Sequence, residues 1–115
     1  MEREIIQSIL REVGVPADLL GHRYIVCALQ LINKEPYALH QMTKVVYPTV
    51  AKENNSTASR VERAIRHAIE RAFDRMPVDV SKEYFGYSIN PNSGKATNSQ
   101  FLAALALELE NKLRS

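Results

Sequence analysis

The stretch that decides the fold covers residues 58–75 and reads ASRVERAIRHAIERAFDR. When it is projected at about 100° per residue, its apolar side chains gather on one side of a helix. These core-facing positions are Val61, Ala64, Ile65, Ala68, Ile69, Ala72 and Phe73. The opposite side carries Ser59, Arg60, Arg63, Arg66, His67 and Glu70. The pattern predicts a helix that buries one face and turns an arginine-rich face outward.

A short polar turn precedes this helix. Residues 54–57 read NNST, and asparagine tolerates the left-handed backbone that such turns need. Thr57 is placed to cap the helix. The helical segment before it, 39–54, contains Pro48, which lacks an amide proton and begins a fresh helical turn or makes a kink. Two helices joined by so short a turn have helix-turn-helix geometry, here expected over 42–75.

Helical periodicity continues through the rest of the chain, with no convincing alternating strand and no internal repeat. The other expected helices cover 3–13, 18–33, 80–85 and 98–113. Gly14 stops the first, and a capping box of Thr97 and Gln100 opens the last. A polar loop is expected over 88–96. The sequence predicts an all-α fold, with about six helices around one core and a central helix-turn-helix, in a single domain over 1–115.

Two of these helices carry long apolar stripes. The second helix has Leu20, Tyr24, Ile25, Ala28, Leu29 and Ile32. The last helix has Phe101, Leu102, Leu105, Leu109 and Leu113. For the last helix two interpretations stay open: packing into the core, or a dimer contact between copies bound in tandem on DNA.

Composition and charge restrict the class of protein. The chain has 45% hydrophobic and 24% charged residues, which is typical of a soluble globular domain. Its net charge is only +2, but residues 44–75 hold seven basic and four acidic side chains, a distribution compatible with nucleic acid. No apolar run approaches the roughly 20 residues of a membrane span, and the acidic, amphipathic start is unlike a signal peptide. A reducing cytoplasm is expected.

Catalytic and metal-binding chemistry finds no support in the sequence. His22, His40 and His67 are scattered without metal-ligand spacing, with His22 expected on a helix surface and His40 at a helix start. Cys27 lies in an apolar stretch and is expected to be a small core residue. No glycine-rich phosphate loop occurs. We therefore expect no enzyme activity, no cofactor and no metal ion.

The start of helix 58–75 carries Arg60, Glu62 and Arg63. The planar fork of arginine suits the O6 and N7 atoms of guanine. A carboxylate facing a polyanion weakens binding unless it accepts a bond from a cytosine amino group. This cluster therefore favours base readout over simple phosphate attraction. The alternative is a solvated surface on which Glu62 and Arg66 form a stabilising pair one turn apart.

Residues 57–70 resemble the recognition helix of the stage-zero sporulation protein A family, the master response regulators of endospore formation. Four further stretches resemble the same family in the same order: 12–17 (EVGVPA), 43–48 (TKVVYP), 85–87 (FGY) and 97–99 (TNS). The resemblance covers nearly the whole chain. It implies a bacterial, nucleoid-associated effector domain of six helices that binds double-stranded DNA at a short TGTCGAA-type site, often as tandem copies.

The resemblance also implies roles for individual residues. Arg60 would read a guanine, Glu62 a cytosine, and Arg63 a nearby base or phosphate. The residues expected to hold the DNA backbone are Ser59, Arg66 and His67, with Lys44, Lys52 and Thr57 as further phosphate candidates.

The chain also departs from the family pattern. Residues 72–77 read AFDRMP where the family has a tryptophan and a Ser-Arg-Gly turn, and 78–83 differ as well. This region of the family contacts the sigma subunit of RNA polymerase, so a chain without that contact is an alternative. No receiver domain with a phosphorylated aspartate is expected within 1–115, which suits an excised effector half or a stand-alone relative. A second functional hypothesis is a protein-interaction module or antagonist that keeps the fold without specific DNA binding.

Overall fold

The fold is all-α, as the periodicity predicts. The computed structural model describes residues 1–86, 89 and 94–115, and these ranges contain no strand. The helices are α1 (Glu2–Glu12), α2 (Leu20–Lys34), the 3₁₀ helix η1 (Pro36–His40), the π-helix η2 (Met42–Val46), α3 (Tyr47–Glu53), α4 (Ala58–Arg75), α5 (Val78–Phe85) and α6 (Asn98–Arg114).

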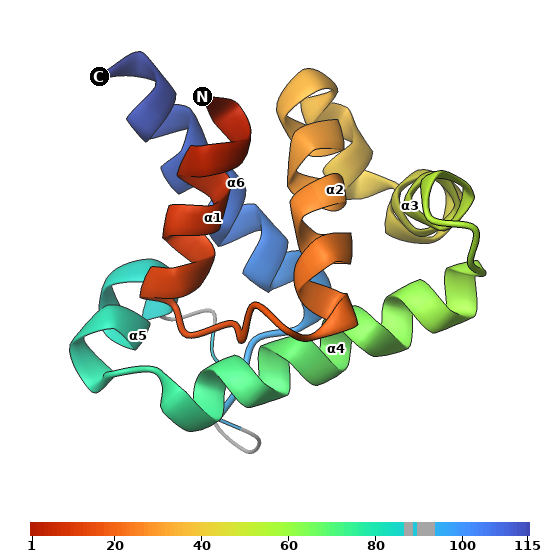
Figure 1. The fold of residues 1–115 in the computed structure, drawn as a ribbon. Coiled ribbons are helices and arrows are strands. Elements are labelled where there is room, and N and C mark those ends of the chain that lie inside the picture. Colours follow the sequence, from red (N-terminus) through yellow and green to blue (C-terminus); the bar gives the residue numbers. More distant parts are fainter. Residues whose placement is uncertain (87–88, 90–93) are drawn as a thin grey trace.

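The long helix α4 forms one side of the molecule (Figure 1). Helices α1, α2 and α6 stand on one side of it, α3 lies at its beginning, and α5 follows its end. α2 packs against α1, α4 and α6, while α3 packs against α4. Among the described residues, no helix lies on the opposite side of α4, and we call this its uncovered side.

The core collects the apolar faces of the four longest helices. Its largest fully buried side chains include Ile6, Ile9, Leu10, Ile25, Leu29, Ile65, Ile69, Phe101, Leu102, Leu105 and Leu109. Burying one such side chain stabilises the fold by about 1.5–3 kcal/mol. The predicted facing of α4 is confirmed at Val61, Ile65, Ala68, Ile69 and Ala72, which are buried. The predicted core residues Ala64 and Phe73 are only half-buried, because they lie at the edges of that face.

Helix α2 approaches α4 very closely at Gly21. A Cβ atom added to Gly21 would lie 2.2 Å from the carbonyl oxygen of Ala64 and 2.7 Å from the Cβ of Ala68. Contacts under 3.0 Å at that position require something to shift. The two helices can therefore lie this close only because glycine meets alanines here.

The turn between α3 and α4 has the predicted chemistry. Asn55 adopts the left-handed backbone with φ of 56°. The amide of Ser56 donates to the carbonyl oxygen of Ala51 at 2.9 Å. Thr57 caps α4, since its hydroxyl oxygen accepts a bond from the amide of Arg60 at 3.2 Å. The pair α3 and α4 thus forms a helix-turn-helix unit.

The segment before this turn differs from the predicted single helix over 39–54. It consists of η1, η2 and α3, with a break at Gln41. Pro48 stands in the first turn of α3, so the interpretation as a fresh helical turn is confirmed. Proline has no amide proton to donate four residues back, and just before it the amide of Val46 donates five residues back to Gln41 at 3.1 Å. His40 ends η1, so its predicted place at a helix start is wrong.

Three other boundaries and burials need correction. α5 begins at Val78, two residues before the predicted start at 80, because Pro77 provides its N-terminal boundary. Leu20 is 54% exposed and Leu113 is 38% exposed, so both predicted stripes run beyond the core at one end. α2 begins at residue 20, after a turn that was predicted as its first residues. Most of the predicted loop over 88–96 lies outside the described residues.

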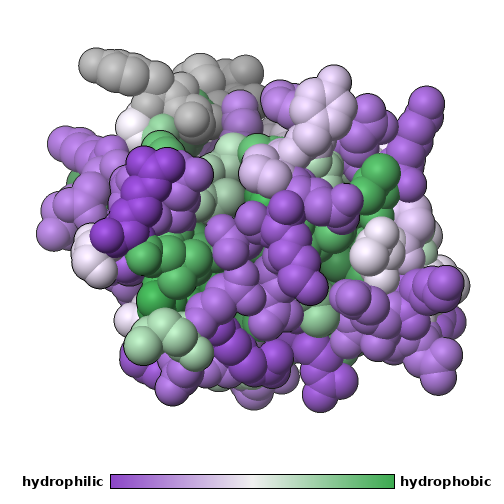
Figure 2. Space-filling view, turned by 90° about the horizontal axis from the view of Figure 1, so that it is seen from above, coloured by the Kyte–Doolittle hydropathy of each residue, from purple (hydrophilic) through white to green (hydrophobic). Residues whose placement is uncertain are grey.

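The face of the molecule opposite α4 is mostly hydrophilic, with separate apolar patches between charged and polar side chains (Figure 2). Among the described residues, no helix is both long and apolar enough to cross a membrane.

Candidate nucleic-acid interface

Helix α4 presents its polar side chains on its uncovered side. All six residues predicted to face outward are exposed in the structure: Ser59, Arg60, Arg63, Arg66, His67 and Glu70. Val61 and Ile65 on the opposite side are 0% exposed. The exposed side chains therefore project from a backbone that the core holds in place, as a helix that enters a DNA groove requires.

Glu62 lies at the edge between the buried and exposed sides of α4. Its side chain is 35% exposed, and its Oε1 atom lies 3.5 Å from Nη2 of Arg66, which is 54% exposed. This is the pair one turn apart that the sequence suggested. A surface ion pair contributes only about 0–1 kcal/mol, so DNA could separate the two groups at little cost.

The weaker phosphate candidates lie on the elements that precede α4. Lys44 is exposed in η2 and Lys52 is exposed near the end of α3. Thr57 is exposed, and its hydroxyl oxygen caps α4. Lys52 and Thr57 therefore lie close to the start of α4 in the chain, while Lys44 lies one element earlier, in η2.

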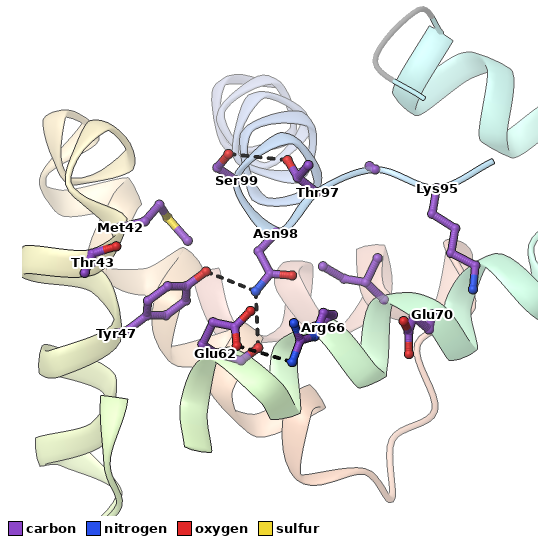
Figure 3. Close-up of a pocket in the computed structure, with 12 residues that line it drawn as sticks. Met42, Thr43, Tyr47, Glu62, Arg66, Glu70, Lys95, Thr97, Asn98 and Ser99 are labelled. Atoms are coloured by element: carbon purple, nitrogen blue, oxygen red, sulfur yellow. Dashed lines mark hydrogen bonds and ion pairs between the residues drawn. The ribbon is translucent and has the colours of Figure 1, made fainter. Parts of the chain in front are cut away.

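A cleft of about 480 Å³ opens beside α4, between η2 and the start of α6 (Figure 3). Its lining residues include Met42, Thr43, Tyr47, Glu62, Arg66, Glu70, Lys95, Thr97, Asn98 and Ser99. The side-chain amide nitrogen of Asn98 donates to the hydroxyl oxygen of Tyr47 at 3.0 Å and to the carbonyl oxygen of Glu62 at 3.2 Å. Figure 3 shows these three residues meeting from three different elements.

The phenol of Tyr47 stays protonated in this cleft. Partial burial is the main cause that raises its pKa, and the nearby charge of Glu62 raises the pKa further. The bond from Asn98 and the charge of Arg66 act in the opposite direction but are weaker. Tyr47 therefore contributes a neutral hydroxyl to this contact.

The sequence did not single out Tyr47 or Asn98 as individual site residues. Both belong to short stretches, 43–48 and 97–99, that carried the family resemblance. They are 51 positions apart in the chain, and no local periodicity relates them. Only the packing of α6 beside α4 brings them together.

The end of α4 is occupied by aromatic packing. The Phe73 ring centroid lies 5.2 Å from that of Phe85 and 6.2 Å from that of Phe101. Phe85 stacks on Phe101 at 5.2 Å, and the hydroxyl of Tyr84 donates to the carboxylate of Glu12. The stretch 72–77 that departs from the family pattern therefore belongs to the contact of α4 with α5 and α6.

The described part of the chain contains no group of three or more His, Cys, Asp or Glu residues that could hold a metal ion. Cys27 is half-buried beside the core, and its sulfur accepts a bond from the side chain of Asn54 at 3.5 Å. It contributes to packing between α2 and the turn after α3.

A capped, arginine-rich helix that follows a short turn and leaves one side uncovered defines a helix-turn-helix domain. Residues 6–109 match the family described as Sporulation initiation factor Spo0A C terminal, and the chain belongs to that family. This confirms the resemblance drawn from the sequence. The family is a DNA-binding effector domain of a response regulator and acts in transcription regulation and sporulation, so the partner class is double-stranded DNA. It is not an enzyme family.

Proposed function

We propose that the chain is a sequence-specific transcriptional regulator that reads a TGTCGAA-type site with α4 in the major groove. The observation that supports this most directly is the orientation of α4: Arg60 and Arg63 are exposed near its capped start, while Val61 and Ile65 on the other side of the helix are fully buried. The start of such a helix is the part that reaches base edges. Family membership supplies the general class of activity.

The proposed roles divide the outward-facing residues of α4, together with Glu62 at the edge of that side, into two groups. Arg60 bonds the O6 and N7 atoms of a guanine, Glu62 accepts from a cytosine amino group, and Arg63 contacts a nearby base or phosphate. The proposed backbone contacts come from Ser59, Arg66 and His67, with Lys44, Lys52 and Thr57 at the flank. Backbone contacts position the protein, and base contacts supply the sequence preference.

Binding to two labelled duplexes tests this proposal. One carries a TGTCGAA-type site and the other a scrambled sequence of the same composition, each measured by fluorescence anisotropy at about 50 and 200 mM salt. We expect clearly tighter binding to the site, with affinity for both duplexes falling steeply as salt rises. Equal, weak binding to the two duplexes would reject specific readout.

Single substitutions then separate base contacts from general attraction. Arg60→Ala should weaken binding to the site by about 1–3 kcal/mol and change binding to the scrambled duplex much less. Arg114→Ala, at the exposed end of α6, is the matched control and should change neither. The cytosine role of Glu62 is wrong if Glu62→Ala leaves the base preference intact.

The second candidate is an interaction module or antagonist that keeps the fold without specific binding. The ion pair between Glu62 and Arg66 favours it, because a paired surface needs no DNA to satisfy its charges. In that case Arg66→Ala would leave all DNA binding unchanged. If Arg66 holds a phosphate, the same substitution lowers the affinity for both duplexes by the same factor.

We also propose that copies of this cytoplasmic regulator bind DNA in tandem.

A third proposal is that the chain contacts the sigma subunit of RNA polymerase through α5. In α5, Val78 is 71% exposed, which leaves an apolar side chain available to a partner. Val78→Asp should remove binding to purified sigma subunit while DNA binding persists. Unchanged sigma binding in this variant would place the contact elsewhere.

A further inference from the structure

Asn98 connects three elements at the point where α4 would enter DNA. It is the first residue of α6, and its side chain reaches the backbone of α4 at Glu62 and the side chain of Tyr47 at the start of α3. Glu62 belongs to the same turn as Arg60 and Arg63, which carry the proposed base contacts. The contact of Asn98 therefore acts on the backbone of the reading turn itself.

The chemistry of the amide fixes how Asn98 is oriented. The carbonyl oxygen of Glu62 can only accept a hydrogen bond, so the nitrogen of the Asn98 amide must face it. That nitrogen has two hydrogens, and the two bonds, to Glu62 and to Tyr47, use both of them. An isosteric aspartate has no donor and would set a carboxylate against the carbonyl oxygen.

The turn that carries Asn98 is itself held firmly. The hydroxyl oxygen of Thr97 accepts from the amide of Gln100 at 3.2 Å, and the Gln100 side chain accepts from the amide of Thr97 at 2.9 Å. This capping box fixes the start of α6. Phe101, one turn further, is fully buried. The core and the capping box thus fix the position of Asn98, and its side chain in turn holds the backbone of α4 at Glu62.

We propose that Asn98 is a positioning residue for base readout, which holds the first turns of α4 at the angle that the base contacts need. The inference rests on the proposed function. Base contacts require donors and acceptors at hydrogen-bond distance in a fixed direction, whereas long basic side chains follow a phosphate through small shifts of the helix. Loss of the link should therefore reduce sequence preference before it reduces general affinity for DNA.

Two variants at this position and one matched control test the proposal in the full chain. Asn98→Ala removes both donors without adding charge, and Asn98→Asp keeps the shape while removing both donors. Asn111→Asp makes the same chemical change at an exposed position near the other end of α6. The measurement is the ratio of affinities for the TGTCGAA-type and scrambled duplexes, with thermal unfolding as a check of folding.

We expect both Asn98 variants to lower the affinity ratio about tenfold, within the range of one lost base contact. In Asn98→Ala, the affinity for the scrambled duplex should stay within about twofold of the wild-type value. In Asn98→Asp, the added negative charge should lower the affinity for the scrambled duplex further. Asn111→Asp should keep the wild-type ratio. An unchanged ratio in Asn98→Ala would overturn the proposal, whether the affinities for the two duplexes stay the same or fall equally.

Hydrogen exchange of the amides of residues 61–66 gives a readout that needs no DNA. We expect these amides to exchange several-fold faster in Asn98→Ala than in the wild type, with amides of α1 unchanged. A wild-type chain without site preference would reject the proposed function, and the exchange rates would still decide whether Asn98 holds this turn. Unchanged exchange over residues 61–66 would show that it does not.

Discussion

The side of α4 that faces α2 and the side that faces the start of α6 are packed in different ways. Toward α2, the backbone of Gly21 lies against Ala64 and Ala68, with no room for one further carbon atom. Toward α6, the cleft stays open, and Asn98 crosses it with two hydrogen bonds. The first contact is apolar and close, and the second is polar and directional.

This difference assigns separate tasks to the two sides. The energy of close packing changes steeply with distance and only weakly with direction. The contact at Gly21 therefore sets how near α2 and α4 lie. A hydrogen bond depends on angle, so the contact at Asn98 restricts how α4 turns about its own axis. A helix that reads bases needs both settings, because its depth and its rotation decide which side chains meet which base edges.

The largest expected effect comes from truncating a fully buried core residue of α4. Ile65 is 0% exposed, and Ile65→Ala should destabilise the fold by about 2–5 kcal/mol, measured by urea unfolding. His67→Ala, on the exposed side of the same turn, is the control and should shift stability by no more than about 0.5 kcal/mol. Equal shifts in the two variants would contradict the facing of α4.

A smaller effect is expected from breaking the close contact on the α2 side. Gly21→Ala places a Cβ atom 2.2 Å from the carbonyl oxygen of Ala64, so the helices must move apart at a cost of about 1–3 kcal/mol. Urea unfolding measures this loss, with Arg23→Ala on the exposed face of α2 as control. Because alanine favours helices more than glycine does, a gain in stability would show that the two helices are not in close contact here.

The smallest effect is expected on the polar side. Tyr47→Phe removes the hydroxyl that accepts one bond from Asn98 and should destabilise by about 0.5–1.5 kcal/mol, while the bond to Glu62 remains. Tyr37→Phe, at a side chain that is 73% exposed, is the matched control and should change nothing measurable. If Tyr47→Phe proved as costly as Gly21→Ala, the division between a packing side and an orienting side would fail.

Much of the fold could be predicted because it depends on neighbours in the chain. The bounds of the helix over 58–75, its cap at Thr57 and the capping box at Thr97 agree with the structure. Each depends on residues within one helical turn, which the sequence displays directly. The division of 36–53 into three elements was missed, since the π turn depends on how Pro48 is accommodated among its neighbours.

The candidate interface divides in the same way. The outward direction of Arg60, Arg63 and Arg66 follows from periodicity alone, and the structure agrees. The place of Glu62 at the border of the cleft does not follow from periodicity, because its surroundings include Asn98, which lies 36 positions further along the chain in another helix.

The sequence by itself determined that the chain is helical, which side of α4 is buried, and which side carries the arginines. Family membership follows from the same residues. Only the tertiary structure decided how α4 is held: by Gly21 on one side and by Asn98 with Tyr47 on the other. The physical reason is range. Helical periodicity depends on residues three and four positions apart, which can be seen in the sequence. The angle between helices results from contacts that exist only after the chain has packed.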